Sequence, residues 1–258
     1  MRLGSAIGAA RRSARAIVVP YVMVDRSRRA RLRSVVTALR EGGATALELG
    51  FPFSDPIADG PVLAAAHEHA LLHGTSWDDL IHAVRVSAAI LPTAVMTYAN
   101  PLVHRGIDRS VSALAGAGAI GLIVPDLSLE ESAPFRAAAR RHRLDLVLLA
   151  APGTEVQRMA AIARGARGFL YLVSHYGTTG GTQRGTSVDL RPLVAAARRA
   201  RPDLPILIGF GVRDARTARR ALATGVDGVI VGTALEERLS RGDTPDSLRR
   251  FVAAIAAA

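Results

Sequence analysis

Short apolar runs alternate along the chain with longer alanine- and arginine-rich segments of helical period. Eight runs have the length of a strand: AIVVPYVMV, TALELG, TAVMTYA, IGLIVPD, LDLVLLAAP, GFLYLVS, PILIGFG and DGVIVGT. They are almost continuously apolar, which is typical of parallel strands covered on both faces. Eight strands with helices between them predict a (β/α)8 TIM barrel, and the 258 residues suit the roughly 250 typical of that α/β fold.

We expect a single domain over residues 1–258, because no linker or change of composition marks a second one. A doubly wound open sheet is the structural alternative, but it normally ends before an eighth strand. The first fifteen residues, MRLGSAIGAARRSAR, are arginine-rich and acid-free. A short N-terminal helix with a polar face is favoured there over a transit peptide. No apolar run approaches the eighteen or so residues of a membrane span.

The basic residues are all arginine, since the 33 Lys+Arg include no lysine, and cysteine is absent. Schiff-base catalysis, thiol nucleophiles, disulfides and cysteine-ligated metals are therefore excluded, and a reducing cytoplasm is compatible. A net charge of +11 raises nucleic acid as a partner. However, the arginines are scattered through helical segments without interleaved aromatic residues. Solvated helix faces are the favoured interpretation, with no nucleic-acid or membrane partner.

The stretch LELGFPFSDPIADGP, residues 47–61, contains two acids that are candidates for catalysis. Glu48 lies at the end of the second apolar run and Asp59 lies in the loop beyond it. Active sites of (β/α)8 barrels lie where strands end and βα loops begin, so both acids can divide acid and base work there. Each has a plainer interpretation, an arginine ion pair for Glu48 and an Asx-Pro turn for Asp59. A charge between strand leucines is nevertheless costly unless it is paired or functional.

Glycine-containing turns follow the last three apolar runs: HYGTTGGTQRG, GFGVR and GTALEER. Backbone amides exposed at such turns, together with the N-terminus of a short helix, can bind phosphate without lysine. Phosphate sites after strands seven and eight are frequent in this fold. The joint placement of the three turns predicts a phosphate site.

The strings LELGFPFSDPIADGP, MTYANPL, GLIVPDLSLEESAPF, YLVSHYGTTGG, IGFGV and VIVGTAL resemble the tryptophan synthase α subunit family in order and spacing, over nearly the whole chain. The resemblance implies a lyase that cleaves indole-3-glycerol phosphate to indole and glyceraldehyde 3-phosphate. It also implies a β-subunit partner in an αββα heterotetramer, a cytoplasmic location and no cofactor in this chain, because pyridoxal phosphate belongs to the β subunit.

The resemblance also assigns roles to single residues. It makes Glu48 the catalytic acid–base group, Asp59 the group that stabilises charge at the indole nitrogen, and Tyr171 a tyrosine near the reacting carbons. The implied phosphate cradle consists of Gly180, Gly211, Gly232 and Thr233. The implied indole pocket is lined by Tyr21, Met96, Tyr98, Ile123, Phe210 and Ile230, most of which would also serve as barrel core.

Three departures from the family pattern concern loops. Met23 stands where the family has a threonine, Val62 begins VLA in place of TIQ, and His175 with Tyr176 precede the glycines after the sixth run. Two alternatives therefore stay open: a stand-alone lyase that acts without a β subunit, and a non-catalytic barrel that regulates one. Indole-glycerol-phosphate synthase and phosphoribosyl-anthranilate isomerase, two other phosphate-binding barrels, are disfavoured because they rely on lysine and cysteine.

Overall fold

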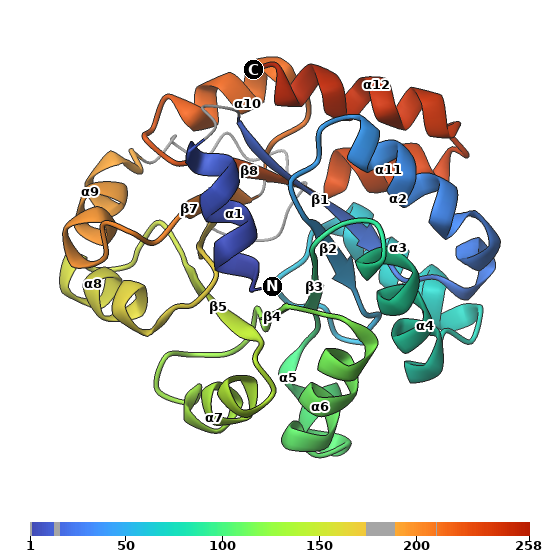
Figure 1. Cartoon of the computed structure of the whole chain (residues 1–258), viewed down its shortest axis with the longest axis horizontal. Helices are drawn as coiled ribbons and strands as arrows, with labels where there is room; N and C mark the ends of the chain where they lie inside the picture. Colours follow the sequence, from blue (N-terminus) through green and yellow to red (C-terminus); the bar gives the residue numbers. More distant parts are fainter. Residues whose placement is uncertain (1, 13–15, 174–188, 210) are drawn as a thin grey trace.

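The computed structural model of the chain describes residues 2–12, 16–173, 189–209 and 211–258. Within these residues eight parallel strands pair in chain order and close into a barrel, with β1 next to β8 (Figure 1). The predicted (β/α)8 fold and all eight predicted strands are confirmed. The strands are β1 (Ile17–Met23), β2 (Leu47–Gly50), β3 (Thr93–Met96), β4 (Gly121–Ile123), β5 (Asp145–Ala150), β6 (Leu170–Val173), β7 (Ile206–Gly209) and β8 (Gly228–Val231).

Most of the helices surround the barrel as an outer ring, whereas α1 lies across one end of it (Figure 1). Several begin at a side chain that caps free backbone N–H groups, as Ser76 does for α4 and Asp214 for α10. In chain order they are α1 (Leu3–Arg12), the 3-10 helix η1 (Arg26–Arg31), α2 (Leu32–Glu41), α3 (Pro61–Leu72), α4 (Trp77–Ala88), α5 (Ala99–His104), α6 (Ile107–Ala117), α7 (Ala133–Arg141), α8 (Val156–Gly165), α9 (Arg191–Ala200), α10 (Ala215–Leu222), α11 (Thr233–Ser240) and α12 (Pro245–Ala256).

Helix α1 closes the end of the barrel at which the strands begin. Leu3 and Ile7 are fully buried and belong to the same apolar cluster as the barrel interior. The Gly4 N–H donates to Oδ2 of Asp145, the first residue of β5, at 2.9 Å. Figure 1 shows α1 lying across the barrel. Access to the interior is therefore from the opposite end, called the mouth below, where the strands end.

The apolar core has two layers. The outer layer lies between the strands and the ring of helices, and the inner layer fills the barrel. Helix α3 contributes Leu63, Ala66 and Ala70 to the inner layer. Because α3 follows the loop after β2, its inward face lies over the mouth and can present side chains to a bound ligand. No helix in the described ranges is long and apolar enough to cross a membrane.

Candidate active site

Glu48 of β2 lies inside the barrel, level with Tyr21 of β1. It is fully buried, and neither of its carboxyl oxygens has a hydrogen-bond partner among the described residues. Burial, and to a lesser degree the negative charge of Asp59, raises the pKa of Glu48 to about 8. Glu48 is therefore protonated at neutral pH and carries a proton that it can donate.

Asp59 lies in the loop between β2 and α3 and is only 5% exposed. Its Oδ2 accepts a hydrogen bond from the Tyr98 hydroxyl at 2.7 Å and lies 3.2 Å from Nε2 of His67. The same Tyr98 hydroxyl accepts the Ala58 N–H at 3.0 Å. Two side chains from different elements thus hold this carboxylate through one oxygen, Oδ2.

His67 was not predicted as a site residue. It is 3% exposed, and its Nδ1 accepts the Phe53 N–H at 2.9 Å. Its position on α3 gives the one available signal, because Leu63 and Ala70 lie four residues before it and three after it, on the buried face of the helix. A histidine on such a face needs partners for both ring nitrogens.

Tyr171 of β6 and Tyr21 of β1 point into the barrel and are both buried. Burial, reinforced by the charges of Glu48 and Asp59, raises the pKa of each hydroxyl well above its ordinary value. The Tyr21 hydroxyl also contacts Sδ of Met23 at 3.9 Å. Both hydroxyls therefore remain protonated over the working pH range.

The residues proposed for the indole pocket come together in the structure where they are described. Phe53 adds an aromatic ring that the sequence did not indicate, stacked on Tyr98 at 5.1 Å between centroids. Phe210 lies outside the described residues. The others are buried and come from four strands and the start of α5: Tyr21, Met96, Tyr98, Ile123 and Ile230.

The residues proposed for the phosphate cradle lie after β7 and β8. Gly211 has a φ of 82°, a left-handed conformation that favours glycine. Gly232 precedes α11, which begins at Thr233. A Cβ on Gly232 would lie 3.7 Å from Leu63 and from Tyr21, so the start of α11 is beside the mouth. Gly180, like His175 and Tyr176, lies outside the described residues.

A family model described as tryptophan synthase alpha chain matches residues 7–256. The chain belongs to the tryptophan synthase alpha chain family. The tryptophan synthase alpha chain of Synechococcus elongatus is 41% identical over 239 residues, covering 92% of this chain and 89% of the relative.

Two solved structures extend the comparison. Tryptophan synthase from M. tuberculosis gives a TM-score of 0.87 at 35% identity, covering 99% of this chain and 97% of that one. A tryptophan synthase α2β2 complex from Pyrococcus furiosus gives 0.84 at 31% identity, covering 94% and 98%. As a tryptophan synthase alpha chain, the protein is a lyase that cleaves indole-3-glycerol phosphate in tryptophan biosynthesis. The family has no cofactor of its own, and pyridoxal phosphate belongs to the β subunit.

Met23, at the end of β1, is where the sequence indicates a departure from the family pattern. Met23 is buried, and its N–H donates to the fully buried carboxylate of Glu236, from α11, at 2.7 Å. Arg28 bridges Glu236 at 2.8 Å and Asp25 at 3.3 Å, so both buried acids have a cation partner. The loop after β1 is thus tied to the helix that begins at the phosphate cradle.

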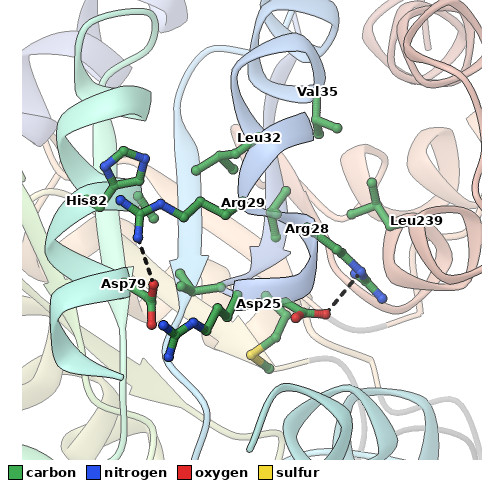
Figure 2. A pocket seen from close by; sticks show the side chains of 13 residues that line it. Asp25, Arg28, Arg29, Leu32, Val35, Asp79, His82 and Leu239 are labelled. Atoms are coloured by element: carbon green, nitrogen blue, oxygen red, sulfur yellow. Dashed lines mark hydrogen bonds and ion pairs between the residues drawn. The ribbon is translucent and has the colours of Figure 1, made fainter. Parts of the chain in front are cut away.

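A separate pocket lies outside the barrel, between β1, α2 and α4, and Figure 2 shows its lining. Arg29 pairs with Asp79 across it at 3.2 Å, and its walls include Leu32 and Val35. Neither Glu48 nor Asp59 lines it. No group of three or more metal-binding side chains comes together in the part of the chain that the structure describes.

Proposed function

We propose that cleavage of indole-3-glycerol phosphate takes place at the mouth, with Glu48 as general acid and base and Asp59 as the acceptor of the indole N–H. One observation carries this proposal: Glu48 is a fully buried carboxyl group with both oxygens free of partners among the described residues, and burial raises its pKa to about 8. A group buried at such cost and left unpaired is suited to proton transfer with a ligand.

The first step protonates the indole ring. Glu48 donates its proton to C3, and the ring nitrogen acquires positive charge as C3 becomes tetrahedral. Asp59 is held through Oδ2, so its Oδ1 can accept the ring N–H and stabilise that charge. This interaction strengthens as the charge develops, which is what catalysis requires.

The second step breaks the carbon–carbon bond. The Glu48 carboxylate takes the proton of the hydroxyl on the carbon attached to C3, and that carbon becomes the aldehyde of glyceraldehyde 3-phosphate. The bonding electrons pass to C3 and restore the aromatic indole. Glu48 ends the cycle protonated, so no net proton is consumed. An amine mechanism is excluded because the chain has no lysine.

The remaining site residues bind and orient the substrate. In this proposal Tyr171 lies near the reacting carbons. Its hydroxyl is close enough to Glu48 and Asp59 for both acids to raise its pKa, in addition to the effect of burial. The indole ring packs on the apolar lining named above. The phosphate is bound by backbone N–H groups at Gly211 and at the start of α11, where the helix dipole favours an anion.

We also propose a β subunit as the partner, in an αββα heterotetramer located in the cytoplasm. The α2β2 complex of the Pyrococcus furiosus relative supports the assembly. The loop that carries Asp59 also exposes an apolar side chain, Ile57, which is 73% exposed. A partner seated there would contact the loop that carries a catalytic group.

The test is indole release from indole-3-glycerol phosphate by the wild type and by Glu48→Gln. Gln keeps the size of the side chain but has no acidic proton, so kcat should fall by at least about a hundredfold. Glu130→Gln is the matched control, because Glu130 is an exposed acid paired with Arg158. Near-normal indole release by a folded Glu48→Gln variant would disprove the assignment.

The same assay with saturating β subunit tests the partner. Met23 replaces the threonine expected from the family, and its N–H is bonded to Glu236 of α11. We therefore expect the β subunit to raise kcat/KM by less than about a hundredfold. A hundredfold increase is near the top of the usual range of allosteric coupling. High activity alone and no increase would instead identify a stand-alone lyase.

A further inference from the structure

We propose that His67 is a positioning residue that determines which carboxylate oxygen of Asp59 faces the substrate. This inference rests on the proposed role of Asp59 as the acceptor of the indole N–H. It concerns a residue on α3 that does not itself touch the reacting atoms.

The hydrogen bonds of His67 determine its tautomer. Nδ1 accepts the Phe53 N–H at 2.9 Å, so Nδ1 carries no proton. The proton of the neutral ring is therefore on Nε2, which lies 3.2 Å from Oδ2 of Asp59 and donates to it. The backbone of the loop thus dictates that the ring is a donor toward Asp59.

Two donors then converge on one oxygen of Asp59. The Tyr98 hydroxyl reaches Oδ2 from the start of α5 and His67 reaches it from α3. A single donor would let the carboxylate turn about its last side-chain bond, whereas two donors from different elements resist that rotation. Oδ1 is left to accept the ring N–H of the substrate.

The same imidazole also fixes the loop between β2 and α3. It bonds the loop at Phe53 and at Asp59, six residues apart. The rings of Phe53 and His67 both pack on Tyr98, at 5.1 Å and 6.1 Å between centroids. Both ring nitrogens are thus satisfied by the loop itself, so the orientation of the imidazole and the shape of the loop depend on each other.

Two substitutions separate the two ring nitrogens. In His67→Asn, the side-chain oxygen can reach the Nδ1 position and accept the Phe53 N–H, but the amide is too short for Asp59. In His67→Gln, the amide nitrogen can reach the Nε2 position and donate to Asp59. We expect His67→Asn to lower kcat by roughly tenfold to a hundredfold, as for a lost hydrogen bond to a charged group, with KM changed less. The loss of kcat should be smaller for His67→Gln.

The matched control is His82→Asn on α4, a partly buried histidine that lines the outer pocket. It should leave kcat unchanged. Equal losses of kcat in His67→Asn and His67→Gln, at equal thermal stability, would overturn the proposal in favour of a packing role. Wild-type kcat in His67→Asn would overturn it too.

A double-mutant comparison isolates the contact with Asp59. In the Asp59→Asn background, His67→Asn should cause little further loss of kcat, because the group it positions is already gone. If the loss of kcat in the double variant equalled the product of the two single losses, the proposal would be overturned. If the wild type releases indole and Asp59→Asn releases it much more slowly, failure at His67 leaves the proposed function standing. Only absence of indole release by the wild type would count against that function.

The tautomer can be measured without any activity. Nitrogen-15 NMR of the histidine-labelled wild type should show one ring protonated on Nε2 with Nδ1 as acceptor, and this signal should be missing from His67→Gln. Protonation on Nδ1 would contradict the hydrogen-bond pattern and overturn the proposal.

Discussion

The ring of Tyr171 in β6 occupies the space that a side chain on Gly209 in the neighbouring strand β7 would need. A Cβ built on Gly209 would overlap the hydroxyl and ring atoms of Tyr171, and Gly50 stands in the same relation to Tyr21. Each mouth-facing tyrosine therefore depends on a glycine in an adjacent strand. This arrangement lets bulky phenols lie within a barrel that is already closely packed.

Gly209→Ala should displace Tyr171 and destabilise the barrel. Overpacking costs about 1–3 kcal/mol, which corresponds to a loss of roughly 5 °C in Tm for a chain of this size. The kcat for indole release should fall as well, because Tyr171 moves. Thermal unfolding followed by circular dichroism measures the first effect, and the indole assay the second.

Gly116→Ala is the control for that substitution. Gly116 lies in α6 with nothing within 4 Å of a built Cβ, so alanine should stabilise the helix slightly. A Gly209→Ala protein with the Tm and kcat of the wild type would show that Tyr171 is not held by this contact.

The pH dependence of catalysis should follow Glu48. Because the proton donor must be protonated, and its pKa is raised to about 8, kcat/KM should be level up to that pH and then fall tenfold per unit. Tyr21 and Tyr171 do not titrate in this range, since their pKa values are raised well above the ordinary value of 10.0. A decrease of kcat/KM with rising pH that began near pH 5 would contradict this assignment.

Asp59→Asn offers a check on the cause of the shift. The charge of Asp59 is the second contribution that raises the pKa of Glu48, after burial. Removing that charge should move the alkaline limb of the residual activity to lower pH, although burial still keeps it above the ordinary range. An unchanged limb would mean that the two acids do not interact.

Glu48 should make the fold less stable as pH rises, whereas a carboxylate paired with a cation makes a fold more stable as pH rises. Between its ordinary pKa of 4.5 and about 8, folded Glu48 keeps a proton that the unfolded chain releases. The unfolding free energy therefore falls as pH rises through this window, by up to about 4 kcal/mol. Glu48→Gln removes this dependence, so its Tm should exceed that of the wild type by roughly 10 °C at pH 9 and be similar at pH 4.5.

The control is again Glu130→Gln, because the bond to Arg158 lowers the pKa of Glu130 and this acid therefore adds no fall in stability as pH rises. Urea unfolding at pH 5, 7 and 9 gives the free energies directly. A gap between wild type and Glu48→Gln that stayed constant with pH would show that the buried carboxyl is not protonated in the native state.

Gly232→Val tests the phosphate cradle apart from the fold. A Cβ at this position meets only ordinary contacts at 3.7 Å, and its φ of −99° is not in the left-handed region, so Tm should change little. The side chain would however cover N–H groups at the start of α11. We expect KM for indole-3-glycerol phosphate to rise more than kcat falls. Equal binding of the substrate with and without its phosphate by the wild type would rule the cradle out.

The pattern of apolar runs was enough to predict the barrel because each strand is buried on both faces. The position of Glu48 at a strand end also followed from this pattern, since the fold places such residues at the mouth. The contacts of Tyr98 and His67 with Asp59 did not follow. They depend on how the loop after β2 bends back over α3. The path of a loop, unlike a strand or a helix, produces no periodic pattern of apolar residues in the sequence. Gly50 and Gly209 were missed for a similar reason, because their role appears only when neighbouring strands are paired.

Helix α1, with Leu3 and Ile7 beneath the barrel, closes one end of it, so among the described residues the mouth is the entrance. Substrate, both products and any protein bound at the rim must share that entrance and the few loops around it. A neighbour bound at the rim would therefore act directly on substrate entry and product release, without any signal passing through the core.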